Sequence, residues 1–275
     1  MTGTSAQLGS PTGDATPPAA GNRPGLRTEL RGVRHRYEGG GRSTDALGPI
    51  DLTIAPGEFV VIVGPSGCGK STLLSLLAGF LTPSEGEVLA DDARVTAPSP
   101  QRGVVFQQPN LYPWYTVREN VALGPRLRGA GRAERRRIAD EHLALVGLED
   151  FGDAKPYELS GGMQQRTQIA RVLANEPALM LLDEPFGALD AMTRERLQQE
   201  LHRIWFGSGR SAVFITHGVD EAVFLGTRVL VMSQRPGRIV FDERPPFGDE
   251  LRTPELRGTP EFAAFSARVR AAIEH

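Results

Sequence analysis

The sequence predicts an α/β fold in which a mainly parallel core sheet carries an antiparallel β edge layer and a helical subdomain. Short apolar runs recur along the chain, and helix-patterned segments separate most of them, as in parallel sheets joined by helices. The first two runs have no helix between them, which indicates the antiparallel layer. A glycine-rich loop follows the third run and leads directly into a helix.

Composition divides the chain into a tail, a main domain and a short extension. Residues 1–25 are rich in Gly, Pro, Ser, Thr and Ala, and we expect a disordered tail without the apolar block of a signal peptide. We expect the main domain over 26–250, a helical subdomain over about 108–175, and a C-terminal helical extension over 251–275. No stretch approaches the roughly 20 apolar residues of a spanning helix, so we do not expect this chain to cross a membrane.

Charge and cysteine content argue against several classes of protein. The net charge of −2 lacks the basic footprint of a nucleic-acid-binding protein. Cys68 is the only cysteine, which excludes an internal disulfide and a cysteine-based zinc site and fits a reducing compartment. Lysine occurs only at Lys70 and Lys155, and every other basic side chain apart from histidine is arginine.

The elements follow in order along the chain. Strands are predicted at 30–37, 50–54 and 58–63, with a loop at 38–48 that contains three consecutive glycines, and then a helix at 70–79. The middle contains a strand at 103–106 and helices at 117–123, 132–146 and 161–175. Strands at 178–182, 212–215 and 229–232, with a helix at 194–205, return to the core, and an amphipathic helix is predicted at 260–273.

The glycine-rich loop matches the P-loop pattern. Its backbone N–H groups can surround phosphates, and the helix behind it presents its positive end. Lys70 would reach the β- and γ-phosphates, Ser71 would offer its hydroxyl to Mg²⁺, and Thr72 would support the phosphates. A simple glycine turn before a helix is the alternative. The residues expected to bind nucleotide here are Gly64, Pro65, Ser66, Gly67, Cys68, Gly69, Lys70, Ser71 and Thr72.

Two carboxylates end the strand predicted at 178–182. Asp183 and Glu184 would stand at the carboxyl edge of the sheet, where ligands bind in parallel sheets. Asp183 suits Mg²⁺ through a water molecule, and Glu184 is then free to activate an attacking water as general base. A solvated acidic turn is the alternative, and the P-loop earlier in the chain weighs against it.

Residues 159–166, Leu-Ser-Gly-Gly-Met-Gln-Gln-Arg, resemble the signature motif of ABC ATPases. The resemblance implies a P-loop NTPase of the ABC type that binds ATP and Mg²⁺. It also implies a head-to-tail homodimer, in which Ser160, Gly161 and Gly162 close on the γ-phosphate held by the partner's P-loop. A glycine-started helix is the alternative for this motif taken alone.

The remaining family positions occur in the expected order. Tyr37 resembles the aromatic that stacks on adenine, and Asp190 lies in a segment similar to the D-loop. Gln107 resembles the glutamine that touches Mg²⁺ and links the core to the helical lobe, with Gln108 as the competing choice. His217 resembles the histidine that contacts the γ-phosphate, although Gly218 replaces the aspartate that usually follows it.

The chain is most similar to import ATPases of the taurine, sulfonate and nitrate group, through residues 103–107, 111–114, 186–193 and 235–238. This implies a small anionic solute, with taurine or another sulfonate first, and nitrate, bicarbonate and thiamine-precursor import as alternatives. The implied partners are two membrane permease subunits and, indirectly, an extracytoplasmic solute-binding protein, with the chain at the cytoplasmic face of the membrane. Non-transport ABC ATPases and a regulatory ATP-binding module are more distant alternatives.

The aromatic segment at 111–115, Leu-Tyr-Pro-Trp-Tyr, allows two interpretations. Tyr112 and Trp114 either form a small satellite core beneath the helical lobe or line a groove that receives a helix of the membrane subunit. We also expect that modification of the Cys68 thiol blocks ATP binding by its bulk and that bound ATP protects the thiol.

Overall fold

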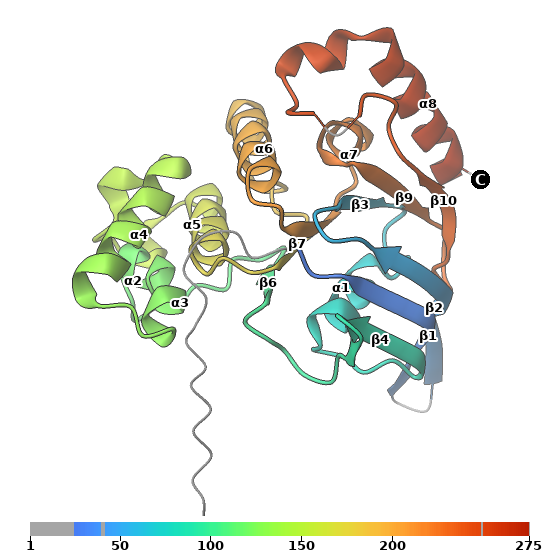
Figure 1. The fold of residues 1–275 in the computed structure, drawn as a ribbon, viewed down its shortest axis with the longest axis horizontal. Helices are drawn as coiled ribbons and strands as arrows, with labels where there is room; N and C mark the ends of the chain where they lie inside the picture. The colour runs from blue at the N-terminus through green and yellow to red at the C-terminus, as the bar shows by residue number, and fades with distance from the viewer. Residues whose placement is uncertain (1–24, 40–41, 249, 275) are drawn as a thin grey trace, which may run out of the picture.

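The computed structural model describes residues 25–39, 42–248 and 250–274, and the predicted tail lies outside them apart from Gly25, which is buried. It contains a six-stranded sheet, a four-stranded sheet and a lobe of helices at one end of the core sheet (Figure 1). The predicted fold class is confirmed. No helix in this described part of the chain combines the length and the apolar character needed to span a membrane.

The six-stranded sheet is the core of the molecule. Its strand order is β10-β9-β3-β8-β7-β6, and all neighbours are parallel except β10, which runs antiparallel to β9. All side chains of β3 and β8 are buried, as expected for strands covered on both faces. The strands are β3 (Phe59–Val63), β6 (Arg102–Val105), β7 (Leu179–Asp183), β8 (Ser211–Ile215), β9 (Arg228–Met232) and β10 (Ile239–Glu243).

The antiparallel layer is larger than predicted. Its order is β2-β1-β4-β5, with β1 (Thr28–Gly39), β2 (Arg42–Ile54), β4 (Glu85–Ala90) and β5 (Ala93–Arg94). The predicted loop at 38–48 is wrong, because β2 already begins at Arg42 and pairs with β1 from Gly39↔Arg42 onward. An Arg36–Asp45 ion pair and the buried Leu47 side chain support this extension.

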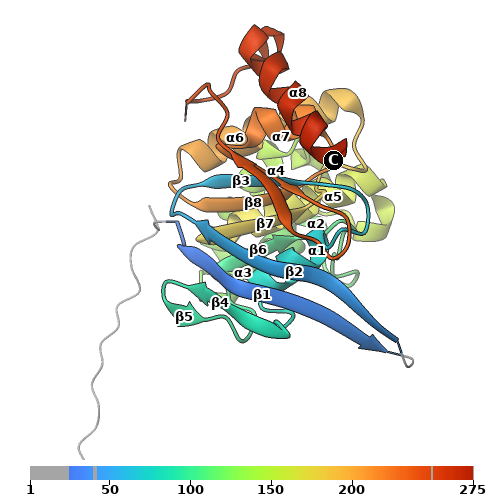
Figure 2. The same ribbon diagram turned by 90° about the vertical axis from the view of Figure 1, so that its right-hand side faces the viewer.

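The helices fall into two groups, and Figure 2 shows α6, α7 and α8 on the face of the core sheet opposite the antiparallel layer. The lobe contains α2 (Val117–Val121), α3 (Leu123–Leu127), α4 (Arg132–Leu145) and α5 (Gly161–Ala174), so the helix predicted at 117–123 is two helices. The core carries α1 (Lys70–Ala78), α6 (Ala191–Phe206), α7 (Val219–Leu225), α8 (Pro260–Glu274) and the 3-10 turn η3 (Pro254–Gly258). Two further 3-10 turns, η1 (Glu149–Phe151) and η2 (Pro156–Glu158), lie between α4 and α5.

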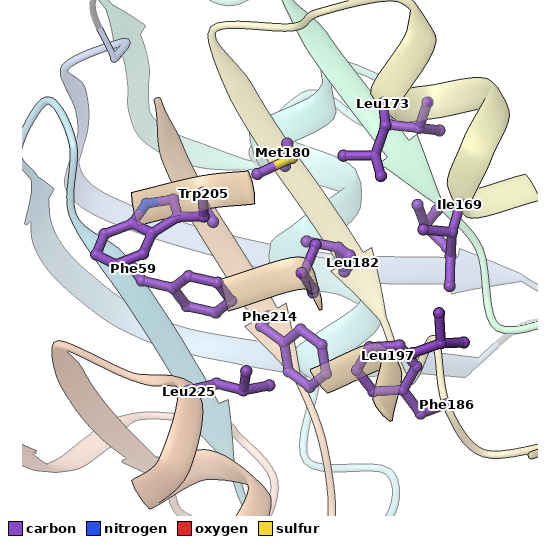
Figure 3. Packing of buried hydrophobic residues seen from close by; sticks show 14 of the residues in the cluster. Phe59, Ile169, Leu173, Met180, Leu182, Phe186, Leu197, Trp205, Phe214 and Leu225 are labelled. Atoms are coloured by element: carbon purple, nitrogen blue, oxygen red, sulfur yellow. The ribbon is translucent and has the colours of Figure 1, made fainter. Parts of the chain in front are cut away.

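Helix α6 is attached to the sheet by one apolar stripe. Leu197, Leu201 and Trp205 lie four residues apart and are buried, so they share one face of the helix. Trp205 meets Phe59 edge to face with ring centroids 5.3 Å apart (Figure 3). Truncating such a buried tryptophan to alanine costs about 3–5 kcal/mol of stability. The C-terminal end of α6 is therefore held firmly against the start of β3.

The C-terminal extension packs into the same core. Phe262, Phe265 and Val269 of α8 are buried in the main apolar cluster, and α8 contacts α7, β9 and β10. The predicted helix at 260–273 is present with an additional residue at its end.

Candidate nucleotide site

The loop between β3 and α1 has the backbone shape of a phosphate cradle. Gly67 and Gly69 have φ angles of 75° and 105°, in the left-handed region that favours glycine. A Cβ on Gly69 would lie 2.6 Å from Leu47 Cδ2 and 2.9 Å from the Ala46 carbonyl oxygen, so β2 leaves no room for a side chain there. No side chain caps α1, and its first N–H groups remain available to an anion.

Lys70 is held in place by this loop. Its side chain is only 5% exposed, and Nζ donates hydrogen bonds to the carbonyl oxygens of Gly64 (2.8 Å) and Pro65 (3.0 Å). These bonds compensate the burial of the ammonium group. They also place a positive charge inside the loop before any phosphate arrives.

Glu184 stands at the centre of the predicted catalytic group. One carboxylate oxygen, Oε1, lies 2.6 Å from His217 Nε2, and the other accepts a hydrogen bond of 3.2 Å from Gln107 Nε2. Glu184 also has a φ angle of 45°, an unusual backbone conformation for a residue with a side chain. Three residues far apart in the sequence thus meet at the end of β7, and Gln107 rather than Gln108 makes this contact.

Asp183 lies beside the start of α1. Burial raises the pKa of its carboxyl group, and a hydrogen bond with the Ser71 side chain opposes that shift. A partly buried carboxylate next to a hydroxyl suits a hard cation such as Mg²⁺, which keeps waters and phosphates as its other ligands. In the described part of the chain, no three His, Cys, Asp or Glu side chains gather to form a metal site of their own. The two residues therefore fit a cation that arrives with the nucleotide.

Tyr37 presents an aromatic surface beside the loop. The side chain is 45% exposed, and its hydroxyl lies 3.2 Å from Thr72 Oγ1 at hydrogen-bonding distance. The ring also meets His35 edge to face. An exposed ring fixed at both ends in this way can stack on a base.

Arg235 is a site residue that sequence reasoning missed. Its Nε donates a 2.6 Å hydrogen bond to the Gly67 carbonyl oxygen of the phosphate loop. The segment that carries it is tied to β2 by Gly237 N–H bonded to the Ala46 carbonyl oxygen at 3.0 Å. The sequence showed the Arg-Pro-Gly-Arg run at 235–238 only as a family resemblance, with no sign that it reaches the loop.

These residues enclose one cleft of about 330 Å³. It is mainly polar, and it joins the aromatic ring, the phosphate loop and the catalytic group. Ten of the predicted site residues line it, together with Ala46 and Arg235: Tyr37, Ser66, Gly67, Gly69, Lys70, Ser71, Thr72, Gln107, Glu184 and His217.

The predicted signature residues do not line this cleft. Ser160 caps α5, with Oγ accepting a 3.3 Å hydrogen bond from the Met163 N–H, and a Cβ on Gly161 would meet nothing within 4 Å. Asp190 caps α6 in the same manner, accepting from the Thr193 N–H at 3.0 Å. Backbone hydrogen bonds at this cap, above all from Thr193, lower the pKa of the Asp190 carboxyl group.

The position of the Cys68 thiol disagrees with the expectation that bound ATP protects it from modification. The side chain is 1% exposed, and Sγ lies 3.8 Å from Lys70 Nζ, beneath the loop and outside the cleft lining. The residue can contribute its backbone to the cradle, while its thiol faces the core.

Comparison with known proteins places these features in a wider group. A family model described as ABC transporter matches residues 47–187. The chain is 53% identical over 232 residues to a putative ATP-binding protein of Brucella abortus, covering 84% of this chain and 88% of the relative. It is 47% identical over 227 residues to the taurine import ATP-binding protein TauB of Roseobacter denitrificans, covering 81% and 84%.

A solved structure agrees with the fold. The dimeric structure of a post-hydrolysis state of the ATP-binding cassette MJ0796, bound to ADP and Pi, superposes with a TM-score of 0.73 at 38% identity. The match covers 79% of this chain and 98% of that cassette.

Proposed function

The chain belongs to the ATP-binding subunits of ABC transporters, of the type that includes taurine import proteins, and we propose that it acts as a head-to-tail dimer that drives uptake of a small anionic solute. Taurine or another sulfonate is the proposed solute. Hydrolysis of ATP to ADP and phosphate is the reaction of the subunit.

The observation that carries the proposal is the contact of Glu184 with Gln107 and His217 at the mouth of the phosphate loop. Glu184 would accept a proton from the attacking water while the new bond to the γ-phosphorus forms and the bond to the leaving ADP oxygen breaks. His217 would contact the γ-phosphate and keep the carboxylate oriented. Gln107 would report the γ-phosphate to the helical lobe, which begins directly after it.

The phosphates and Mg²⁺ would be held by groups already in place. Lys70 and the loop N–H groups would neutralise the β- and γ-phosphates, and Ser71 would offer its hydroxyl to the cation. Asp183 would bind the cation through water, which would relieve the cost of its buried charge. The cation would supply charge neutralisation in the transition state.

A dimer is proposed because the start of α5 has no nucleotide partner within its own subunit. Ser160 and the glycines after it offer backbone N–H groups of a helix start, yet they lie outside the cleft. The dimeric MJ0796 cassette supports a dimer here. In our proposal, Ser160 and Gly162 of one subunit complete the γ-phosphate site of the other.

The proposed membrane partners are two permease subunits, with a solute-binding protein acting indirectly from the far side of the membrane. The surface proposed to meet a permease is the aromatic segment 111–115. Trp114 is 66% exposed, so the satellite-core interpretation is wrong for this residue. The segment follows Gln107 closely, and this would let nucleotide binding act on a permease at the cytoplasmic face of the membrane.

Substitution Glu184→Gln tests the catalytic part of the proposal. The amide keeps the shape of the side chain and cannot accept the proton, so we expect ATP turnover to fall at least about 100-fold while ATP binding persists and dimers accumulate. Steady-state hydrolysis and equilibrium nucleotide binding measure the two effects. Turnover within a few-fold of wild type would contradict the role of Glu184.

Uptake of labelled taurine tests the solute. Cells that carry the matching permease and binding protein should accumulate taurine with the wild-type chain and not with Glu184→Gln. Uptake of nitrate or bicarbonate in place of taurine would overturn the solute and leave the catalytic proposal intact.

A further inference from the structure

The loop that carries His217 is braced by the residue before the histidine. Thr216 Oγ1 accepts a 2.9 Å hydrogen bond from the Gly218 N–H. This bond links the residue before His217 to the residue after it. The same hydroxyl donates to Glu221 Oε2 in a short contact. The orientation of Thr216 is thus coupled to the position of the Glu221 carboxylate.

Glu221 passes this contact on to α6. Its second oxygen, Oε1, accepts a 2.7 Å hydrogen bond from Gln198 Nε2, and Gln198 is itself buried. Burial raises the pKa of the Glu221 carboxyl group, against the lowering effect of its bonds to Thr216 and Gln198. A carboxylate in such a position depends on these donors, and it has little freedom to turn away from them.

Arg257 connects the network to the C-terminal extension. Its Nη2 donates a 2.5 Å hydrogen bond to Gln198 Oε1, which fixes the amide so that its nitrogen points to Glu221. The guanidinium lies over the Phe224 ring, with Cζ 4.0 Å from the ring centroid. Arg257 belongs to η3, far along the chain from the phosphate loop.

On this side the loop borders a second cleft. This cleft has a volume of about 490 Å³, and its lining includes Glu184, His217, Gln198 and Arg257. Side chains of the network therefore form part of the wall beside the predicted catalytic pair.

We propose that Glu221 and Arg257 are positioning residues that orient His217 toward Glu184, so that the C-terminal extension supports ATP hydrolysis in its own subunit. The inference rests on the proposed function, because it concerns the histidine assigned there to the γ-phosphate. Loss of Arg257 would leave the Gln198 amide free to rotate, and loss of the Glu221 carboxylate would release Thr216.

Steady-state ATPase assays of single variants test the proposal, with kcat expressed per ATP-binding site measured by equilibrium binding. We expect Arg257→Ala to lower kcat about fivefold and Glu221→Ala about tenfold, with KM within about twofold of wild type, because nucleotide binding does not use the network. Glu221→Gln should stay within about threefold of wild type, because an amide can still bond both neighbours. A purely structural loss would reduce the number of binding sites and leave kcat per site unchanged.

Arg268→Ala is the matched control, since Arg268 lies in the same extension and pairs with Glu243 away from this loop. It should leave kcat unchanged. The double variant Arg257→Ala/His217→Ala should have the same kcat as His217→Ala alone, because both substitutions act through the same imidazole. Wild-type kcat per site in both Arg257→Ala and Glu221→Ala would overturn this inference alone. Full turnover in His217→Ala would instead overturn the role of the histidine in the proposed function.

Discussion

Two helices of this chain begin with glycine-rich turns, and their surroundings differ. The start of α1 is enclosed by β2, by the 233–238 segment and by the catalytic residues, and its lysine is buried. The start of α5 is exposed, and Ser160 caps its own helix without contact to the nucleotide cleft. The same backbone chemistry is therefore complete within the chain at one place and presented outward at the other.

In our proposal, this difference means that one subunit holds most of one nucleotide site and contributes a separate piece of another. Lys70, Ser71 and Glu184, the predicted phosphate ligand, metal ligand and general base, line one cleft at the start of α1. The helical lobe would contribute a surface that acts on the nucleotide of a second chain. We propose that the core hydrolyses ATP and that the helical lobe transmits nucleotide binding to the second subunit and to the permease.

The largest expected effect comes from Ser160→Arg at the start of α5. A long cation there should block the contact of α5 with the nucleotide held by the second subunit, without touching the cleft of its own subunit. We expect ATP turnover to fall about 100-fold, in the range found when a transition-state donor is removed, with ATP affinity unchanged. Leu127→Arg is the control, because Leu127 is equally part of the lobe and highly exposed. Loss of ATP affinity in Ser160→Arg would contradict the comparison.

A smaller effect on the isolated subunit is expected from Trp114→Ala in the aromatic segment of the lobe. Because the side chain is largely exposed, stability should change by no more than about 0.5 kcal/mol and the isolated subunit should hydrolyse ATP normally. Copurification with the permease and solute uptake should both fail. Leu127→Ala should leave both intact. A fall in uptake that only follows lost stability would exclude the docking role.

On the core side, His202 should make stability depend on pH. Burial, together with the nearby Arg252 charge, lowers the pKa of His202 to about 4. The unfolded chain takes up this proton near pH 6.5 and the folded chain does not, so the free energy of unfolding should fall as pH falls from about 6.5 to about 4, by up to about 3 kcal/mol.

His202→Phe keeps a ring in the aromatic cluster around Trp205 and removes the titration. Urea unfolding at several pH values should show a shallower acid dependence in this variant. The raised pKa values of Asp183 and Glu221 act in the opposite direction in both proteins and so cancel in the comparison. If the free energy of unfolding depended on pH equally in the two proteins, the lowered pKa of His202 would be contradicted.

The smallest effect is expected at Cys68. Because its thiol is buried beneath the loop, a maleimide should label the native protein slowly both with and without MgATP, and rapidly in urea. Cys68→Ala should retain turnover within about twofold, because the backbone of the loop does the binding. Fast native labelling that ATP prevents would restore the expectation drawn from the sequence.

Elements with a clear hydrophobic periodicity or a sequence motif could be predicted, and elements that depend on tertiary contacts could not. Strands β3, β7 and β8 at the centre of the core sheet are largely apolar runs, so their positions were predictable. Helix α7 was missed because it is seven residues long and mostly buried, which leaves no amphipathic pattern. Strand β10 was missed because its side chains are only partly buried and it pairs only at the sheet edge.

The same distinction applies to the site. The phosphate loop is local in sequence, so its residues were predictable as a set. Arg235 and Arg257 reach their partners only through the fold, and one arginine among many gives no signal in the sequence. The roles of the predicted site residues stay predictions that the substitutions above address.

Mixed dimers test the central claim most directly. A Lys70→Ala subunit lacks a working phosphate loop, and a Ser160→Arg subunit lacks a working α5 start, so each homodimer should be inactive. If every site combines one subunit's loop with the other's α5, a mixed dimer isolated through two different tags keeps one intact site. Its turnover should recover to roughly half of the wild-type value per dimer when the two sites act independently. Turnover in the purified mixed dimer as low as in either parent would contradict the claim that the two glycine-rich helix starts serve different subunits.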